Sequence, residues 1–381
     1  MIYENISPRI PLLVPQLPDA EQLLPYLRRI DQGKWYSNFG PLVRELEAKL
    51  EVNFQAANSQ GAHVTTFSNC TAGLELVLTA LELPPKSKVL IPALTFVGTA
   101  TAVVKAGLIP VATDIDAATW QMTPAIARDA IGRNRAAAVM PVATFGCPLD
   151  TDAWDSVARD TGVPVVIDAA AAYGNQWSCG DATLVFSMHA TKVLAAGEGG
   201  FAVTRSTALA KKLRRLTNFG INLGDCPDVP LGLVPLAGSN AKMSEYHAAV
   251  GLASLDRFHD DAAGRIEVAR RYMRIVDSHL AEKVTWQEFS NGVIRSTMCA
   301  IFNLEADRTK AIAALMRSGI AVRTWDCPLI PEHTGFAGTA DSTGVVTAKN
   351  VAGRLLGLPF YATLTDGDIE EIAVIIKQAL S

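Results

Sequence analysis

The hydrophobic positions between residues 62 and 170 follow two alternating patterns. Short runs of consecutive apolar and β-branched residues are typical of buried strands, and the longer stretches between them are typical of helices. We expect strands at 63–68, 88–95, 109–116, 136–144 and 163–170, and helices at 70–83, 96–107, 123–132 and 150–162. Strands and helices that alternate at this spacing predict an α/β fold, in which helices cover both faces of a parallel sheet.

The second half of the chain departs from this alternation. Strand-like runs at 183–189 and 199–205 have little helix between them, and a helix at 206–220 is expected to end at Gly220. The Gly- and Pro-rich stretch 221–240 predicts a long loop, a connection that is usually functional inside a compact domain. A helical region that begins at Lys242 follows this loop. We expect a large domain at 1–255 and a smaller α+β domain at 256–381, with a strand at 295–305 and helices at 307–319 and 365–381.

Composition narrows the classes of function. The chain has 381 residues, 49% of them hydrophobic, and a formal net charge of −4, so it offers no basic face for nucleic acid. The N-terminal stretch lacks a signal-peptide profile and no apolar run is long enough to span a bilayer, so we expect a cytoplasmic protein that does not bind membranes. The six cysteines are scattered and no Cys/His cluster has zinc spacing, so we expect no metal site.

Polar residues stand where the predicted strands end. Asp168 ends the strand at 163–170, and Ser187 and Lys192 follow the next strand. In open parallel sheets, ligands bind beyond the carboxyl ends of the strands. A buried aspartate needs a cation or an N–H partner, and a desolvated lysine can act as a nucleophile toward a carbonyl. A structural Asp–Lys ion pair is the alternative interpretation of these two residues.

The start of the helix at 70–83 has the form of an anion site. The first turn of a helix leaves backbone N–H groups unpaired, and the helix dipole favours negative charge there. Ser68, Asn69 or Thr71 could instead be a simple N-cap. A phosphate site, a carboxylate and a lysine together suit pyridoxal 5′-phosphate (PLP), whose phosphate, pyridine nitrogen and aldehyde need these three partners.

Several motifs, in order along the chain, resemble those of the DegT/DnrJ/EryC1/StrS sugar aminotransferases, a family of PLP enzymes of fold type I. They are "SNCTAGLELVLTAL", "PALTFVGTATAVVKAGLIPVATDID", "VVIDAAAAYG", "FSMHATKVLAAGEGG" and "GSNAKMSEYHAAVGL". The resemblance extends from "GKWYSNFGPLVRELEAKL" to "LGLPFYATLTDGDIEEI". It implies an aspartate-aminotransferase-like large domain with a mainly parallel sheet, followed by the smaller α+β domain.

The resemblance also implies a role for each matching residue. Lys192 forms the Schiff base and moves protons, and Asp168 pairs with the pyridinium nitrogen. Phe96 stacks on the ring, although an aromatic at a strand end can also be a packing residue. Asn240 reaches the phosphate of a neighbouring subunit, so the active unit is a homodimer with shared sites. The phosphate of the subunit's own cofactor is held by Cys70, Thr71 and Ser187.

The chain departs from the family pattern at four places. Cys70 replaces a glycine before the phosphate-binding threonine, and Ile167 replaces a frequent glutamate. Ala171 stands where the family has Gln or His in contact with the ring oxygen, so either Asn175 or Gln176 substitutes for it or the pKa of the Schiff base differs. The segment "RTWDCPLIPEH" at 323–333 is only loosely similar.

The resemblance implies transamination from L-glutamate to a nucleotide-linked keto-deoxysugar. The runs "NFGI" and "GSNAKMSEYHAA" are most similar to members that act at C4 of a dTDP-4-keto-6-deoxyhexose. A C3 ketosugar aminotransferase or a ketocyclitol aminotransferase would share nearly every motif. The branch of the family that performs cofactor-dependent deoxygenation replaces the lysine with histidine, so Lys192 argues against it. A PLP-binding protein without catalytic activity stays a further alternative, because of Ala171 and the loosely similar segment.

Overall fold

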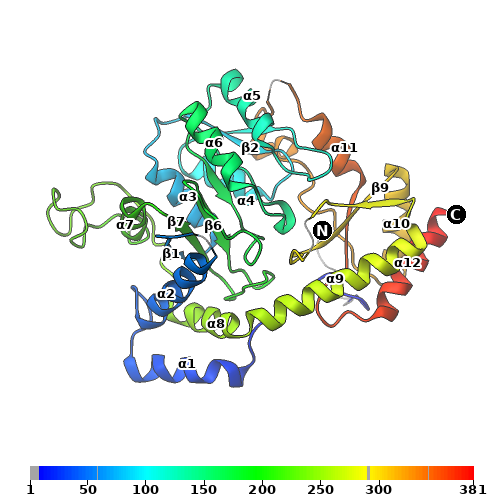
Figure 1. The fold of residues 1–381 in the computed structure, drawn as a ribbon, viewed down its shortest axis with the longest axis horizontal. Coiled ribbons are helices and arrows are strands. Elements are labelled where there is room, and N and C mark those ends of the chain that lie inside the picture. Colours follow the sequence, from blue (N-terminus) through cyan, green and yellow to red (C-terminus); the bar gives the residue numbers. More distant parts are fainter. Residues whose placement is uncertain (1–7, 58, 290–291, 342) are drawn as a thin grey trace.

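The computed structural model describes residues 8–57, 59–289, 292–341 and 343–381. A seven-stranded arrangement forms the centre of the large domain (Figure 1). Two sheets, with strand orders β1-β7-β6-β5 and β3-β2-β4, are joined by parallel bridges from Val139 to Val165 and from Val142 to Asp168. The strands are β1 (His63–Phe67), β2 (Lys88–Pro92), β3 (Ile109–Thr113), β4 (Ala138–Val139), β5 (Val166–Asp168), β6 (Thr183–Ser187) and β7 (Gly200–Thr204).

Strand directions agree with the predicted mainly parallel sheet. β7 runs antiparallel to both β1 and β6, and the other pairs are parallel. Every residue of β5, β6 and β7 is buried, as expected for strands covered on both faces. The helices of this part are α1 (Ala20–Gly33), α2 (Pro41–Ala56), α3 (Cys70–Ala80), α4 (Val97–Lys105), α5 (Pro124–Asn134), α6 (Thr151–Thr161), α7 (Thr207–Leu216) and α8 (Glu245–Asp256).

A second, antiparallel sheet of order β10-β9-β8 forms the smaller α+β part. The long helix α9 runs into it from the large domain, and α12 packs along α9 (Figure 1). The elements are α9 (Phe258–Leu280), β8 (Val284–Trp286), β9 (Met298–Phe302), α10 (Glu305–Arg317), α11 (Val346–Arg354), β10 (Leu355–Leu358) and α12 (Asp366–Leu380). Within the described ranges, none of the helices has the length and apolar composition needed to cross a bilayer.

The N-terminal segment also packs on this smaller part. Ile10 pairs with Ile320 in a parallel bridge and is buried in the core formed by α9, α10 and α12. Arg9 forms an ion pair with Glu371 at 2.6 Å. The predicted division after residue 255 lies within the last turn of α8, and it stays a prediction.

Two of the differences from the predicted helices concern the long loop and the helical region after it. The helix expected to reach Gly220 ends at Leu216, because Asn218 pairs with Asn240 across the base of the following loop. Gly220 has a φ of +84°, and a Cβ there would lie 1.9 Å from the Leu236 carbonyl oxygen, so the glycine allows the two ends of the loop to cross. The long helical region that begins after this loop is divided at Arg257 into α8 and α9.

Candidate active site

The turn before α3 exposes unpaired backbone N–H groups. The Asn69 side chain caps the helix by accepting from the Ala72 N–H at 2.8 Å. Cys70 and Thr71 are the first two residues of the helix, so their N–H groups have no acceptor within it. The N-cap alternative and the anion site are therefore compatible, because different groups serve the two purposes.

Gly200 lets this turn lie close to the sheet. A Cβ at Gly200 would lie 2.7 Å from the Cys70 nitrogen and 2.8 Å from the Phe186 carbonyl oxygen, so α3 would have to shift. We expect Gly200→Ala to destabilise the protein by about 1–3 kcal/mol through overpacking. We also expect it to weaken PLP binding by about 10-fold, equivalent to one charge-assisted hydrogen bond.

Urea unfolding and titration of the apoprotein with PLP would measure both effects of Gly200→Ala. The matched control is Gly264→Ala on α9, where a Cβ would meet nothing within 4 Å. That variant should be as stable as the wild type or slightly more stable, because alanine favours a helix over glycine. Unchanged stability and PLP affinity in Gly200→Ala would contradict the close approach of α3 to β7.

Phe96 and Thr71 both lie close to Gly98. A Cβ at Gly98 would lie 3.1 Å from both Phe96 Cδ1 and Thr71 Oγ1. Phe96 precedes α4 and is 59% exposed, which is unusual for a packing residue and leaves its ring available to a ligand. The structure therefore places the predicted stacking residue next to the predicted phosphate turn.

Asp168 is a buried carboxylate at the end of β5. Its side chain accepts hydrogen bonds from Thr99 Oγ1 at 2.8 Å and from the Ala170 N–H at 3.1 Å. Burial raises the pKa of Asp168, whereas these two bonds and the positive charge of Lys192 oppose the rise. Thr99 was not among the predicted site residues. Its hydroxyl group binds one carboxylate oxygen of Asp168. Because Thr99 lies on α4, this helix fixes the orientation of that carboxylate.

Lys192 lies in the turn between β6 and β7. Its N–H donates to the His189 carbonyl oxygen at 2.8 Å, and its side chain is close enough to Asp168 and Cys70 to interact with both electrostatically. Burial and the Asp168 charge raise the pKa of the Cys70 thiol, so the thiol stays protonated and is not a nucleophile. Ser187 accepts from the His189 N–H at 3.3 Å, which leaves its own O–H free to donate.

The side chains next to Ala171 are already bonded elsewhere. Asn175 Nδ2 donates to the carbonyl oxygens of Gly146 and Ile294, both at 2.8 Å, and its oxygen accepts from the Ile294 N–H. Gln176 is buried and joins Leu149 to Ser178. Both amides therefore join backbone segments in this structure, and neither is observed in the role of the donor that Ala171 lacks.

Asp326 is a site residue that the sequence analysis did not select. It lies in the 323–333 segment, which docks on the loop before Phe96 through a hydrogen bond from the Ile330 N–H to the Ala93 carbonyl oxygen at 3.0 Å. Burial raises the pKa of Asp326 to about 6; Lys192 and Arg323 oppose the rise. The small domain therefore supplies a second carboxylate near Lys192.

We expect Asp326→Asn to stabilise the apoprotein at pH 7.5 by about 1 kcal/mol, because the charged carboxylate is unfavourable in the folded protein and partial exposure of the residue to solvent reduces that cost. A carboxyl group whose pKa is raised in the folded state favours folding below that pKa, and this contribution is lost as the pH rises from about 4 to 6. The gain should therefore vanish at pH 4. Urea unfolding at both pH values would test this, with Asp129→Asn on the exposed face of α5 as the control. An equal gain at both pH values would contradict the assignment.

Asn240 lies on the long loop that follows α7. It is exposed at the base of the long loop that follows α7, and Figure 1 shows this loop standing out from the body of the molecule. The structure thus brings together Cys70, Thr71, Phe96, Asp168, Ser187 and Lys192 at one edge of the sheet, whereas Asn240 is exposed on the loop, one residue before Ala241, whose carbonyl oxygen accepts from the Ser68 N–H.

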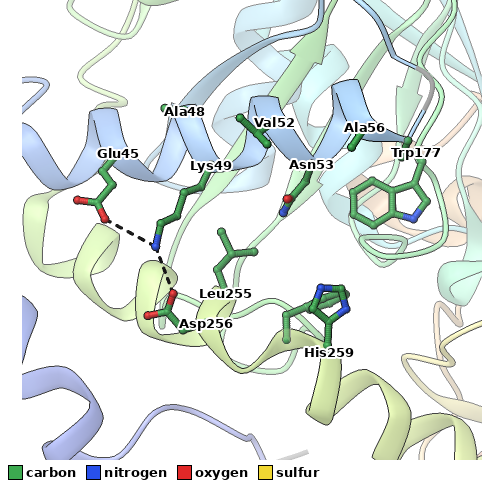
Figure 2. A pocket seen from close by; sticks show the side chains of 12 residues that line it. Glu45, Ala48, Lys49, Val52, Asn53, Ala56, Trp177, Leu255, Asp256 and His259 are labelled. Carbon is green, nitrogen blue, oxygen red and sulfur yellow. Dashed lines mark hydrogen bonds and ion pairs between the residues drawn. The ribbon is translucent and has the colours of Figure 1, made fainter.

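A surface hollow lies at a different place. A groove of about 690 Å³ lies between α2 and the α8–α9 junction (Figure 2). Its charged residues already pair with one another, since Lys49 lies 3.2 Å from Asp256 and 3.7 Å from Glu45. Neither Lys192 nor Asp168 lines it, so its size does not make it the candidate site.

Comparison with known proteins identifies the family. A model of the DegT/DnrJ/EryC1/StrS aminotransferase family matches residues 18–377. The chain belongs to this family. A dTDP-4-amino-4,6-dideoxy-D-glucose transaminase of Shigella dysenteriae is 30% identical, covering 96% of this chain and 97% of that protein. A GDP-perosamine synthase of Caulobacter vibrioides is also 30% identical, covering 98% and 99%.

The solved structures confirm the predicted fold. DesI, crystallised with its TDP-sugar product, superposes with a TM-score of 0.83 at 32% identity, over 98% of this chain and 93% of that one. The prediction of an aspartate-aminotransferase-like fold with a smaller α+β domain is confirmed.

The residues present at the site fit PLP. The free N–H groups of Cys70 and Thr71 and the O–H of Ser187 are donors suited to a phosphate. The exposed ring of Phe96 offers a flat surface, and Asp168 and Lys192 supply the carboxylate and the amine. These are the residues that would hold the cofactor in this aminotransferase.

Proposed function

We propose that this aminotransferase uses PLP to transfer an amino group from L-glutamate to a nucleotide-linked keto-deoxysugar. The acceptor we propose is a dTDP-4-keto-6-deoxyhexose, aminated at C4. The observation that carries the proposal is the position of Lys192, within electrostatic range of the buried Asp168 and beside the free N–H groups of α3. The relatives named for a dTDP-4-amino sugar and for GDP-perosamine support the sugar class.

Each side chain contributes one function in this proposal. When bound, PLP supplies an aldehyde and an electron-accepting ring. Lys192 Nζ holds the cofactor and moves a proton first as general base and then as general acid. Asp168 keeps the pyridine nitrogen protonated, and Thr99 orients its carboxylate. Cys70, Thr71 and Ser187 hold the phosphate, and Phe96 covers the ring.

Absorption spectroscopy tests the proposal directly. The purified protein with PLP should show a yellow band that L-glutamate converts to the pyridoxamine phosphate band, and a dTDP-4-keto-6-deoxyhexose should restore the first band. Mass spectrometry of the sugar would identify the product. The absence of the first band would overturn the cofactor assignment. A band that glutamate leaves unchanged would indicate another donor or a PLP-binding protein without catalytic activity.

We also propose that the enzyme is a homodimer in which Asn240 of one subunit reaches the phosphate of the other. A mixture of Lys192→Ala and Asn240→Ala subunits tests this arrangement. If Asn240 acts across the interface, each mixed dimer contains one intact site and one site with both defects, so activity returns. If Asn240 acts within its own subunit, every site carries a defect and the mixture stays inactive.

A further inference from the structure

Backbone hydrogen bonds join the two ends of the long loop after α7, next to Asn240. The Phe219 N–H donates to the Ser239 carbonyl oxygen at 3.0 Å, and the Gly238 N–H donates to the Phe219 carbonyl oxygen at 3.1 Å. Asn218 and Asn240 face each other as an antiparallel bridge. Their side chains therefore lie next to each other at the base of the loop.

Lys242 connects these two asparagines. Its Nζ donates to Asn218 Oδ1 at 3.0 Å and to Asn240 Oδ1 at 2.7 Å, and it lies 4.8 Å from the centre of the Phe219 ring. An ammonium group can only donate hydrogen bonds, so it fixes the oxygen of each amide toward itself. Each amide nitrogen must then point away from Lys242.

The two amide nitrogens and the ammonium group form an arrangement suited to an anion. In the part of the chain that the structure describes, neither Asn218 Nδ2 nor Asn240 Nδ2 donates to a protein acceptor, and Lys242 has no ion-pair partner. Burial lowers the pKa of Lys242, so its charge is poorly solvated and a nearby anion would stabilise it. Donor groups and an uncompensated positive charge favour a phosphate over a cation.

The alternation of side chains places this arrangement on the exposed side of the segment. Ala241 is buried, and its carbonyl oxygen accepts from the Ser68 N–H at 2.7 Å, next to the phosphate turn of the same chain. Successive side chains of an extended segment point to opposite sides, so Asn240 and Lys242 lie opposite to Ala241. Asn240 is accordingly exposed.

We propose that Lys242 is a positioning residue that holds Asn218 and Asn240 with their amide nitrogens outward, so that both amides bind the cofactor phosphate of the partner subunit. Asn218 is then a second phosphate-binding residue on this loop. The inference rests on the proposed PLP-dependent homodimer.

Binding of PLP and of pyridoxal, which lacks the phosphate, tests this role in the full-length apoprotein. Asn218→Ala and Lys242→Met should each weaken PLP binding about 10-fold and leave pyridoxal binding unchanged. Lys242→Arg, which keeps two donors, should restore most of the affinity. In the double variant the loss should be smaller than the product of the two single losses, because both act through one arrangement.

The outcomes separate this inference from the function on which it depends. Equal losses for PLP and pyridoxal, or unchanged PLP affinity in Asn218→Ala, would overturn the role of the two amides while the wild type still binds PLP. A wild type that binds no PLP would instead overturn the proposed function. Lys211→Ala, on the exposed face of α7, is the control and should change neither affinity. Thermal unfolding and sedimentation of each variant would show that the fold and the oligomeric state are retained.

Discussion

Lys192→Ala is expected to lower the rate of amino transfer by about 10⁴-fold or more. The variant loses both the nucleophile that holds the cofactor and the base that moves the proton, and each role alone contributes a large factor. The yellow band of the wild type with PLP should be absent. Stopped-flow absorbance after mixing with L-glutamate would measure the rate.

The control for this variant is Lys377→Ala, which removes an exposed lysine of α12 and should behave as the wild type. Lys192→Ala should remain folded, because its side chain is only partly buried and accounts for no hydrogen bond of the core. PLP should still bind to it through the phosphate-binding groups of α3. A variant that keeps the band and reacts with glutamate would show that another amine performs the reaction.

The local pattern of the sequence predicts the sheet and the residues at its edge. The strand that ends in Asp168 and the strand that precedes Lys192 can each be recognised from a stretch of about ten residues. The carboxyl ends of parallel strands meet at one edge of the sheet, so the local pattern also predicts that these residues lie near each other. These features therefore follow from the sequence without knowledge of the tertiary arrangement.

Contacts between distant segments could not be predicted in this way. Thr99 reaches Asp168 only because β2 and β5 are both next to β4, and the pattern around α4 does not encode strand order. Asp326 approaches Lys192 from the other domain. The start of α2 is held by Glu245, whose carboxylate accepts from the Leu42 and Val43 N–H groups at 2.8 and 2.9 Å, from about 200 residues away.

The departure at Ala171 shows a different limit. The sequence indicated that a donor was missing and offered Asn175 and Gln176 as substitutes on the basis of their proximity along the chain. The structure uses both amides to join backbone segments, so proximity in sequence did not predict what these side chains bind.

Asp168→Asn is expected to lower the rate by about 10²–10³-fold, and to raise the stability of the apoprotein near neutral pH. The amide has the shape of the carboxylate, but it cannot keep the pyridine nitrogen protonated, so the stabilisation of developing charge is lost. Stability should change in the opposite direction, because burial raises the pKa of Asp168 and the charge is unfavourable in the folded protein. Kinetics with L-glutamate and urea unfolding of the apoprotein would measure the two effects.

The pH dependence distinguishes this explanation from a general change in packing. Since the pKa of Asp168 is higher in the folded state, protonation of Asp168 stabilises the folded wild type at low pH, and this stabilisation is lost as the pH rises. The gain in stability of Asp168→Asn should therefore disappear under acid conditions.

Thr99→Val is the matched variant. It keeps the carboxylate but removes the 2.8 Å hydrogen bond, so it should reduce both the rate and the stability. If Asp168→Asn instead lost stability at neutral pH, the attraction between Asp168 and Lys192 would outweigh the cost of burying the carboxylate. Asp168 would then stabilise the apoprotein as well as serve its reaction.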